Sequence, residues 1–293
     1  MDLTGFADLW EHVRLLSDGP RNAALLSLLK RHAPDARVCE IGCGSGLLSL
    51  IAARMGARKV YAVEPTALHH SARALVQANN LQSVVEVLDG RIQDVAPPAG
   101  GVDLIFSELL NADPLVEGVL DAMDAAAAWR APGGVVAPRR LQLWLALVRD
   151  ASSAREHQRA KRAIGALGER WGLSLGPLEA ALDNLGAYRY LSPKIEPVGP
   201  PVCWFDAHLG HGRRPDQTIA VEASVTEATP ISGVAIWFSA ELDDGLVLHN
   251  RPGHPGHWGH MVFGWPTERG ARAGETIRLE IAVDDEEIDV RPC

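Results

Sequence analysis

Two glutamates nine positions apart, Glu108 and Glu117, have the residue type and spacing of a cation-binding pair. Glu108 comes shortly after the expected strand 103–106, which is apolar from 104 onward, and Glu117 lies on the loop that comes next. Ligands bind at the carboxyl ends of strands in open α/β sheets, so Glu108 is expected at such a site. The two carboxylates together are suited to hold a guanidinium, whose planar N–H groups pair with carboxylate oxygens. Taken alone, Glu117 would be a solvated residue near the start of a helix.

A second stretch, V-C-E-I-G-C-G-S-G over residues 38–46, has the pattern of a nucleotide-binding loop. Gly42, Gly44 and Gly46 permit a tight turn and let a ligand approach the main chain closely. An amphipathic helical pattern over 46–55 follows at once, which gives the order strand, glycine loop, helix. A turn with a purely structural role is the alternative.

Two further acids indicate which nucleotide this loop would bind. Glu64 stands 22 residues after Gly42, where a carboxylate can accept hydrogen bonds from both ribose hydroxyls. Glu40 lies two residues before Gly42, where it would repel a pyrophosphate but suits the ammonium of an amino-acid group. The glycine spacing is also not that of the dinucleotide fingerprint. We therefore expect S-adenosylmethionine as the cofactor, in preference to NAD.

The elements that must position these residues alternate between strand and helix in the first half of the chain. Helical patterns cover much of 6–32, with a break at 18–20. The alternation predicts an α/β, Rossmann-like fold, with a mostly parallel sheet and helices on both faces. The expected elements are strand 36–41, helix 46–55, strand 59–64, helix 66–79, strands 83–88 and 102–107, a helix near 114–130 and strand 134–137.

The second half has a different character, which predicts two domains, 1–138 and 139–293. Short apolar runs divided by Gly, Pro and Asp turns predict an antiparallel β-barrel or sandwich. Residues 151–192 are helical in pattern and rich in charge, so they form an inserted arm, either a solvated hairpin or a dimer contact. The expected strands are 141–149, 201–209, 217–226, 232–240, 245–249, 259–265 and 276–283.

Composition excludes several classes of protein. The chain has 293 residues, is 47% hydrophobic and carries a formal net charge of −9, so nucleic acid is not an expected partner. No apolar run approaches membrane-spanning length, and the first residues lack the basic charges of a signal peptide. The four cysteines show neither metal-site nor disulfide spacing, so we expect a cytoplasmic protein.

A histidine-rich loop offers a rival chemistry. His249, His254, His257 and His260 lie within twelve residues. The surrounding Pro-Gly loop does not place them on one helical face, and no cysteine or carboxylate completes a metal site at suitable spacing. We therefore expect no metal at this loop.

The chain resembles the protein arginine methyltransferases over nearly its whole length. The motifs that carry the resemblance are E-I-G-C-G-S-G-L-L-S, Glu64 and S-E-L-L-N-A-D-P-L-V-E-G, and the last is most similar to the monomethylating branch. The family implies a Rossmann-like S-adenosylmethionine domain followed by a β-barrel with a helical dimerisation arm, here as a single module of bacterial type. It implies a homodimer.

The resemblance also implies roles for individual residues. Arg21 of the D-x-x-R motif would pair with the methionine carboxylate, and the Asp18–His257 pair would carry away a proton. Trp258, in a G-H-W that replaces the family's T-H-W, would wall the substrate pocket together with Leu15 and Phe6. The remaining implied cofactor contacts are His12, Cys43, Leu47, Pro65, Gly90, Arg91, Ile92 and Gln93, with Glu108 beside the cofactor.

The expected function is methyl transfer from S-adenosylmethionine to a guanidino nitrogen of arginine, free or in a peptide, with a monomethylated product. Glu108 and Glu117 would hold the guanidinium and leave one nitrogen facing the methyl group. Two alternatives stay open: methylation of another small guanidine or amine, and a non-catalytic interaction protein that keeps the fold.

Overall fold

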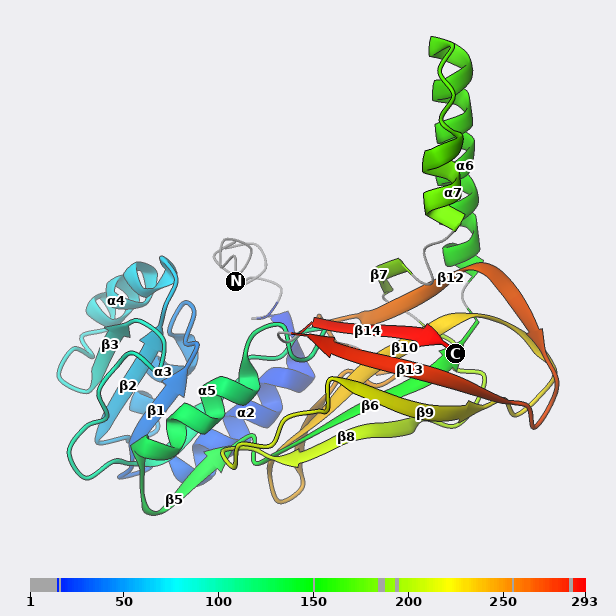
Figure 1. Ribbon diagram of the computed structural model, residues 1–293. Coiled ribbons are helices and arrows are strands. Elements are labelled where there is room, and N and C mark those ends of the chain that lie inside the picture. The colour runs from blue at the N-terminus through cyan, green and yellow to red at the C-terminus, as the bar shows by residue number, and fades with distance from the viewer. Residues whose placement is uncertain are drawn as a thin grey trace.

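The structure is a computed structural model that describes residues 15, 17–149, 151–183, 188–192, 195–254, 256–284 and 287–293. Within these ranges, five parallel strands form one sheet in the order β3-β2-β1-β4-β5 (Figure 1). Val38 of the central strand is level with Val60 on one side and Leu104 on the other, and all three are fully buried. The strands are β1 Arg37–Ile41, β2 Lys59–Glu64, β3 Val85–Asp89, β4 Val102–Ser107 and β5 Arg130–Ala137.

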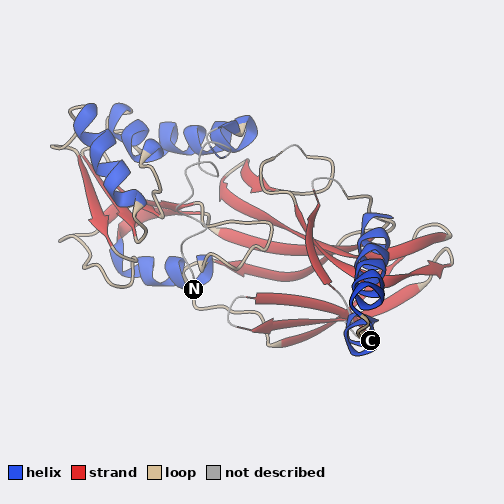
Figure 2. Cartoon of the chain, turned by 90° about the horizontal axis from the view of Figure 1, so that it is seen from above, coloured by secondary structure: helices blue, strands red, loops and turns tan. Residues whose placement is uncertain are grey.

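Helices cover both faces of this sheet (Figure 2), as the alternating pattern predicted. They are α2 Gly19–His32, α3 Leu47–Arg54, α4 Leu68–Ala78 and α5 Val119–Ala126. The helix expected near 114–130 is wrong at both ends. Gly118 has a φ of 73°, so a regular helix cannot begin before Val119, and β5 already begins at Arg130 after one 3₁₀ turn, η2 (Ala127–Trp129).

The rest of the chain forms antiparallel sheets in a barrel-like arrangement, which confirms the predicted fold class. One described sheet has the order β7-β12-β10-β6-β8, with β11 paired to β10, and the other has the order β14-β13-β9. The strands are β6 Arg140–Val148, β7 Tyr188–Ser192, β8 Val202–His208, β9 Thr218–Ser224, β10 Thr229–Asp243, β11 Leu246–His249, β12 His260–Ala271, β13 Thr276–Asp284 and β14 Glu287–Pro292.

Two of these strands differ from the expectations. Residues 188–192 were expected in the helical arm but form β7, because β12 supplies their hydrogen-bond partners from far along the chain. The strand β14 was not predicted, although Ile288 and Val290 alternate with polar residues and are fully buried. The many acidic residues in and before this segment hide the alternation in the sequence, and the segment becomes a strand by pairing with β13.

The arm consists of α6 (Ala151–Trp171) and α7 (Gly176–Asp183), which project away from both sheet regions (Figure 1). Four large apolar side chains on it are exposed: Leu167 by 50%, Trp171 by 66%, Leu173 by 59% and Leu178 by 55%. No helix in the described part of the chain is both long and apolar enough to cross a membrane.

Helix α2 joins the two sheet regions. At its C-terminal end, Nη1 of Arg31 and Nε2 of His32 lie 3.0 and 2.9 Å from Oδ2 of Asp243, the last residue of β10. The hydrogen bond to His32 is the main cause that lowers the pKa of Asp243. The N-terminal end of the same helix carries Asp18 and Arg21 toward the site described next.

Candidate active site

The glycine loop follows β1 directly and lies against the loop that carries the two glutamates. The backbone N–H of Gly42 donates to the carbonyl of Val63 over 2.9 Å, which turns the chain back toward β2. Gly42, Gly44 and Gly46 have φ values of 72°, 53° and 80°, a conformation that residues with a Cβ rarely adopt. A Cβ at Gly42 would lie 2.6 Å from Cδ2 of Leu109, so the two loops touch at this point.

Glu64 ends β2 and holds the glycine loop in place. Its Oε2 accepts the backbone N–H of Gly44 over 2.7 Å. Its Oε1 accepts both the backbone N–H and the hydroxyl of Thr66, over 2.9 and 2.6 Å. The carboxylate therefore fixes the glycine loop against the turn after β2, and its contact with ribose hydroxyls stays a prediction.

Glu40, predicted to face an ammonium, is buried between β1 and α3. Its carboxyl accepts a hydrogen bond from the hydroxyl of Ser49, which is also buried. Burial raises the pKa of Glu40 to about 8, against the opposing effects of the Ser49 hydrogen bond and the charge of Arg21. In this structure Glu40 ties the strand to the helix, and its role toward the cofactor stays a prediction.

The other predicted cofactor contacts surround the end of β2. Leu47 is the first residue of α3 and is partly exposed, Cys43 is buried, and Pro65 lies between Glu64 and Thr66. His12, like the predicted substrate contact Phe6, lies outside the described residues.

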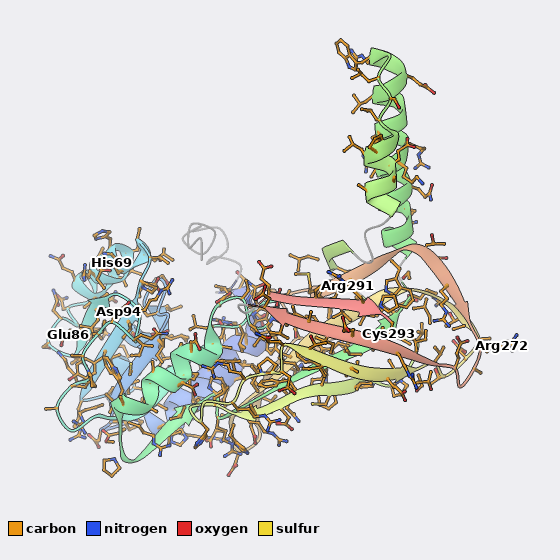
Figure 3. The ribbon with its side chains drawn as sticks, viewed as in Figure 1. His69, Glu86, Asp94, Arg272, Arg291 and Cys293 are labelled. Carbon is orange, nitrogen blue, oxygen red and sulfur yellow. The ribbon has the colours of Figure 1, made fainter. Side chains whose placement is uncertain are left out.

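A turn after β3 carries the residues expected to contact adenine. The backbone N–H of Gly90 donates to the carbonyl of Glu64 over 3.3 Å, which brings this turn beside β2. Ile92 is buried, whereas Arg91 and Gln93 are exposed. Asp94, labelled in Figure 3, closes the turn by donating its N–H to the carbonyl of Arg91 over 2.9 Å.

Glu108 is a buried acid with one free acceptor atom. Its side chain is 6% exposed, and its Oε2 accepts hydrogen bonds from Nε of Arg21 over 2.7 Å and from Nη2. Burial raises the pKa of Glu108, although the charge and hydrogen bonds of Arg21 act in the opposite direction. Oε1 of Glu108 is buried and has no hydrogen-bond partner among the residues that the structure describes.

Glu117 lies at the other end of the same loop, two residues before α5. Its Oε1 accepts a hydrogen bond of 2.9 Å from the side-chain amide of Asn111. Burial raises the pKa of Glu117 to about 8, and the nearby charge of Glu108 acts in the same direction. The fold therefore brings the two predicted acids close enough to repel each other.

Asp18 and His257 form the expected pair across the two sheet regions. Oδ2 of Asp18 lies 2.8 Å from Nδ1 of His257 and accepts its backbone N–H over 3.0 Å. Oδ1 of Asp18 accepts the backbone N–H of Arg21 over 3.0 Å, so the same carboxylate caps α2. Burial alone would raise the pKa of Asp18, but these hydrogen bonds outweigh it and the pKa is lowered.

Trp258 connects the histidine loop to the glutamate loop. Its indole Nε1 donates to the carbonyl of Leu110 over 2.9 Å. Its ring meets Phe238 edge to face at 5.1 Å and lies 4.3 Å from the ring of His257. Leu15 accepts the backbone N–H of Asp18 through its carbonyl, and its place beside a substrate stays a prediction.

This arrangement has three chemical capacities. The glycine loop and Glu64 can hold a nucleoside, and the free oxygen of Glu108 with Glu117 can hold a planar cation. The imidazole of His257, oriented by Asp18, can accept a proton.

Comparison with known proteins identifies the family. A family model described as ribosomal protein L11 methyltransferase (PrmA) matches residues 22–137. Protein arginine N-methyltransferase PRMT10 of Arabidopsis thaliana is 37% identical over 307 residues, which cover 94% of this chain and 80% of that protein. The chain belongs to the protein arginine N-methyltransferase family.

Other relatives of this arginine methyltransferase agree. An arginine N(omega)-methyltransferase of Streptomyces achromogenes subsp. streptozoticus is 29% identical over 94% of this chain and 76% of that protein. The crystal structure of Arabidopsis thaliana protein arginine methyltransferase 10 superposes with a TM-score of 0.81 at 24% identity, over 98% of this chain and 92% of that one. The Trypanosoma brucei PRMT1 enzyme–prozyme complex with AdoHcy superposes at 0.79 and 20% identity, over 95% and 90%. The protein is an S-adenosylmethionine-dependent arginine N-methyltransferase.

The histidine loop of this methyltransferase is held by contacts within the protein. The ring centroids of His249 and His254 lie 4.1 Å apart with the rings tilted by 57°, and Nδ1 of His260 lies 3.3 Å from the carbonyl of Ser192. No group of three or more metal-ligating side chains comes together within the described ranges.

Sequence reasoning missed three residues that support the site. Thr66 fixes Glu64, Asn111 fixes Glu117, and Asn250 holds the ends of the histidine loop together. The Asn250 amide accepts the N–H of Phe238 over 2.8 Å and donates to the carbonyl of Gly259 over 2.9 Å. The positions of Thr66 and Asn111 beside predicted acids were the available signal, whereas nothing in the local pattern marks Asn250.

Proposed function

We propose that this enzyme transfers one methyl group from S-adenosylmethionine to an ω-nitrogen of arginine and yields chiefly monomethylarginine. The observation that carries the proposal is the pair Glu108 and Glu117. One oxygen of Glu108 is buried without a partner among the described residues, and the charge of Glu108 raises the pKa of Glu117. The charge of Glu108 is close enough to disfavour ionisation of Glu117, and a bound guanidinium, whose shape matches a pair of carboxylates, would relieve that repulsion.

The residues around the glycine loop fit S-adenosylmethionine. Glu64, whose carboxylate already accepts the N–H of Gly44, would hold the ribose hydroxyls. Arg21, whose guanidinium already donates to Glu108 and Asn22, would also face the methionine carboxylate. Burial raises the pKa of both Glu40 and Glu108, and a cationic sulfonium bound beside them would favour their ionised forms. When bound, the cofactor supplies an electrophilic methyl group.

The protein's own residues then act on the substrate. A free guanidinium has a pKa of about 12.5–13.8, and its nitrogens are weak nucleophiles because the charge is delocalised. Glu108 and Glu117 would hold two of its N–H groups and concentrate positive charge there, which leaves the third nitrogen richer in electrons. As the new N–C bond forms and the S–C bond breaks, that nitrogen loses one proton, which His257 can accept with Asp18 behind it.

The form of the arginine is the open part of the proposal. One relative is named a protein arginine N-methyltransferase and another an arginine N(omega)-methyltransferase, so both peptidyl and free arginine are candidates. Purified protein should therefore be offered free L-arginine, an Arg-Gly-rich peptide and a small guanidine that is not an amino acid. Mass spectrometry of each product then identifies the acceptor and the number of methyl groups.

The decisive variants are Glu108→Gln and Glu117→Gln, with Glu86→Gln as the matched control. Glu86 lies on β3, where it pairs with Lys59 at the surface (Figure 3). We expect both site variants to lose at least about a hundredfold in turnover, and the control to keep it. If both variants bind S-adenosylmethionine and turn over arginine normally, the proposal is wrong. If wild-type protein methylates only the small guanidine and neither form of arginine, the substrate is a guanidine other than arginine.

We further propose a homodimer formed through α6 and α7. The exposed apolar side chains Leu167, Trp171, Leu173 and Leu178 lie on this projecting arm, and burial of such a surface favours association. A location in the cytoplasm stays a prediction from the cysteine pattern.

A further inference from the structure

Asn111 lies between the two glutamates on their shared loop and fixes one of them. Its Oδ1 accepts the backbone N–H of Ala112 over 2.7 Å, and its Nδ2 donates to Oε1 of Glu117 over 2.9 Å. The first hydrogen bond sets which side of the amide carries the oxygen, so the nitrogen must face Glu117. The amide therefore has a defined orientation.

The same pattern divides the four carboxylate oxygens of the site. Oε2 of Glu108 is taken by Arg21, and Oε1 of Glu117 is taken by Asn111. Oε1 of Glu108 is buried without a partner within the described ranges. Among the described residues, Glu108 thus has one oxygen engaged by the protein and one left for a ligand, and Asn111 engages one oxygen of Glu117.

We propose that Asn111 is a positioning residue for the methyl transfer, which orients Glu117 so that its second oxygen, together with Oε1 of Glu108, receives the substrate guanidinium. The inference rests on the proposed function. A guanidinium held this way contacts one oxygen of each acid, with its third nitrogen directed away from both.

The hydrogen bond from Asn111 also acts on the charge of Glu117. Burial and the charges of Glu108 and Glu64 disfavour its ionised form, whereas Asn111 and Arg21 favour it. Burial and the charge of Asp18, which contacts His257, raise the pKa of the neighbouring Glu108. Loss of the Asn111 donor therefore makes Glu117 harder to ionise, and an added carboxylate at 111 strengthens that effect.

The sharpest test is Asn111→Asp, which keeps an oxygen for the N–H of Ala112, removes the donor to Glu117 and places a second carboxylate beside it. Asn79→Asp is the matched control, because the Asn79 amide donates to a carbonyl on the exposed surface of α4. The kcat and KM for arginine, the Kd for S-adenosylmethionine and the pH profile of kcat/KM are measured for each. Both Asn111→Asp and Asn79→Asp are then measured again in protein that also carries Glu117→Gln.

We expect Asn111→Asp to lower kcat/KM for arginine about 10- to 100-fold and to move the acidic limb of its pH profile upward by about one unit. The Kd for S-adenosylmethionine should stay within about twofold of wild type. In the Glu117→Gln background the same change should have little further effect, because the two residues act as one unit.

A loss of activity with no shift of the acidic limb, or an equal loss in both backgrounds, would overturn the role of Asn111. An unchanged kcat/KM would overturn it as well. If Glu117→Gln itself is fully active, the proposed function fails, which is a different result. If Asn111→Asp folds poorly, Asn111→Ser is the second variant. Its hydroxyl is a shorter donor, so it should be more active than Asn111→Asp.

Discussion

Nε of Arg21 lies 2.7 Å from Oε2 of Glu108, although 87 positions separate the two residues in the chain. The side chains are 8% and 6% exposed, so this is a buried ion pair between the first turn of α2 and the loop after β4. Arg21 places a guanidinium on the acid that is proposed to hold the substrate's guanidinium. Because Arg21 uses only Oε2, both cations can share one carboxylate.

Replacement of Arg21 by Gln should make stability more sensitive to pH. Without its partner, Glu108 is a buried acid whose raised pKa rises further. Such a group is neutral at low pH, and its stability penalty grows as the pH rises from about 4.3, the unfolded value, toward the folded pKa. Denaturant unfolding at pH 5 and pH 8 should therefore show a larger loss at pH 8. Arg21→Lys, which keeps the charge, is the control, and an equal loss at both pH values would contradict the argument.

Glu117→Gln should stabilise the protein while it abolishes turnover. Burial raises the pKa of Glu117 to about 8, so the wild type loses stability as the pH rises from about 4.3 to 8, whereas an amide does not ionise. Asn111 can still donate to the amide oxygen of the variant. Unfolding curves should coincide near pH 4 and separate by pH 8, with the variant more stable. A constant difference across this range would mean that Glu117 ionises freely.

Two substitutions of Asp18 should distinguish its contact with His257 from its role as the N-cap of α2. Asp18→Asn keeps an oxygen for the N–H of Arg21 but loses the acceptor for His257, whereas Asp18→Ala loses both and should cost about 1 kcal/mol more in stability. The pKa of Asp18 is lowered, so its contribution is present above about pH 3.9 and fades as the pH falls through the folded value. The Asn variant should therefore be less stable than wild type at pH 6, and the difference should shrink as the pH falls below about 3.9. Both variants should lower kcat.

Trp258→Phe should weaken catalysis more than cofactor binding. The change keeps an aromatic ring against Phe238 but leaves the carbonyl of Leu110 without its donor. We expect kcat/KM for arginine to fall about 3- to 10-fold, with an unchanged Kd for S-adenosylmethionine. Trp144→Phe, on β6 away from this loop, is the matched control. Equal effects of the two changes would argue against a link between the loops.

The arm should determine the oligomeric state. Trp171→Glu combined with Leu178→Glu places charge on two exposed apolar positions of α6 and α7. Light scattering should give twice the chain mass of 31.5 kDa for wild type and the single mass for the double variant. Val247→Glu, an exposed apolar position on β11, should remain dimeric. A wild type that is monomeric at all concentrations would exclude the proposed dimer.

The local pattern was sufficient for the parts of the fold that repeat along the chain. The strand–glycine–helix unit at 37–54 and the alternation that follows it predicted the parallel sheet, because apolar period and glycine position reflect local geometry. The strand β7 could not be found in this way. Its hydrogen bonds go to β12, and a segment of five residues inside a helical pattern carries no mark of a distant partner.

The sequence by itself determined which residues carry the candidate chemistry: a glycine loop, Glu64 at the end of the next strand and two glutamates on one loop, each recognisable by residue type and spacing. The tertiary structure decided which atoms of those residues remain for a ligand. Arg21 takes one oxygen of Glu108 and Asn111 takes one of Glu117. The reason is that a hydrogen bond depends on the approach of two groups in space, and the pairing of Arg21 with Glu108 arises only when α2 folds against the end of the sheet.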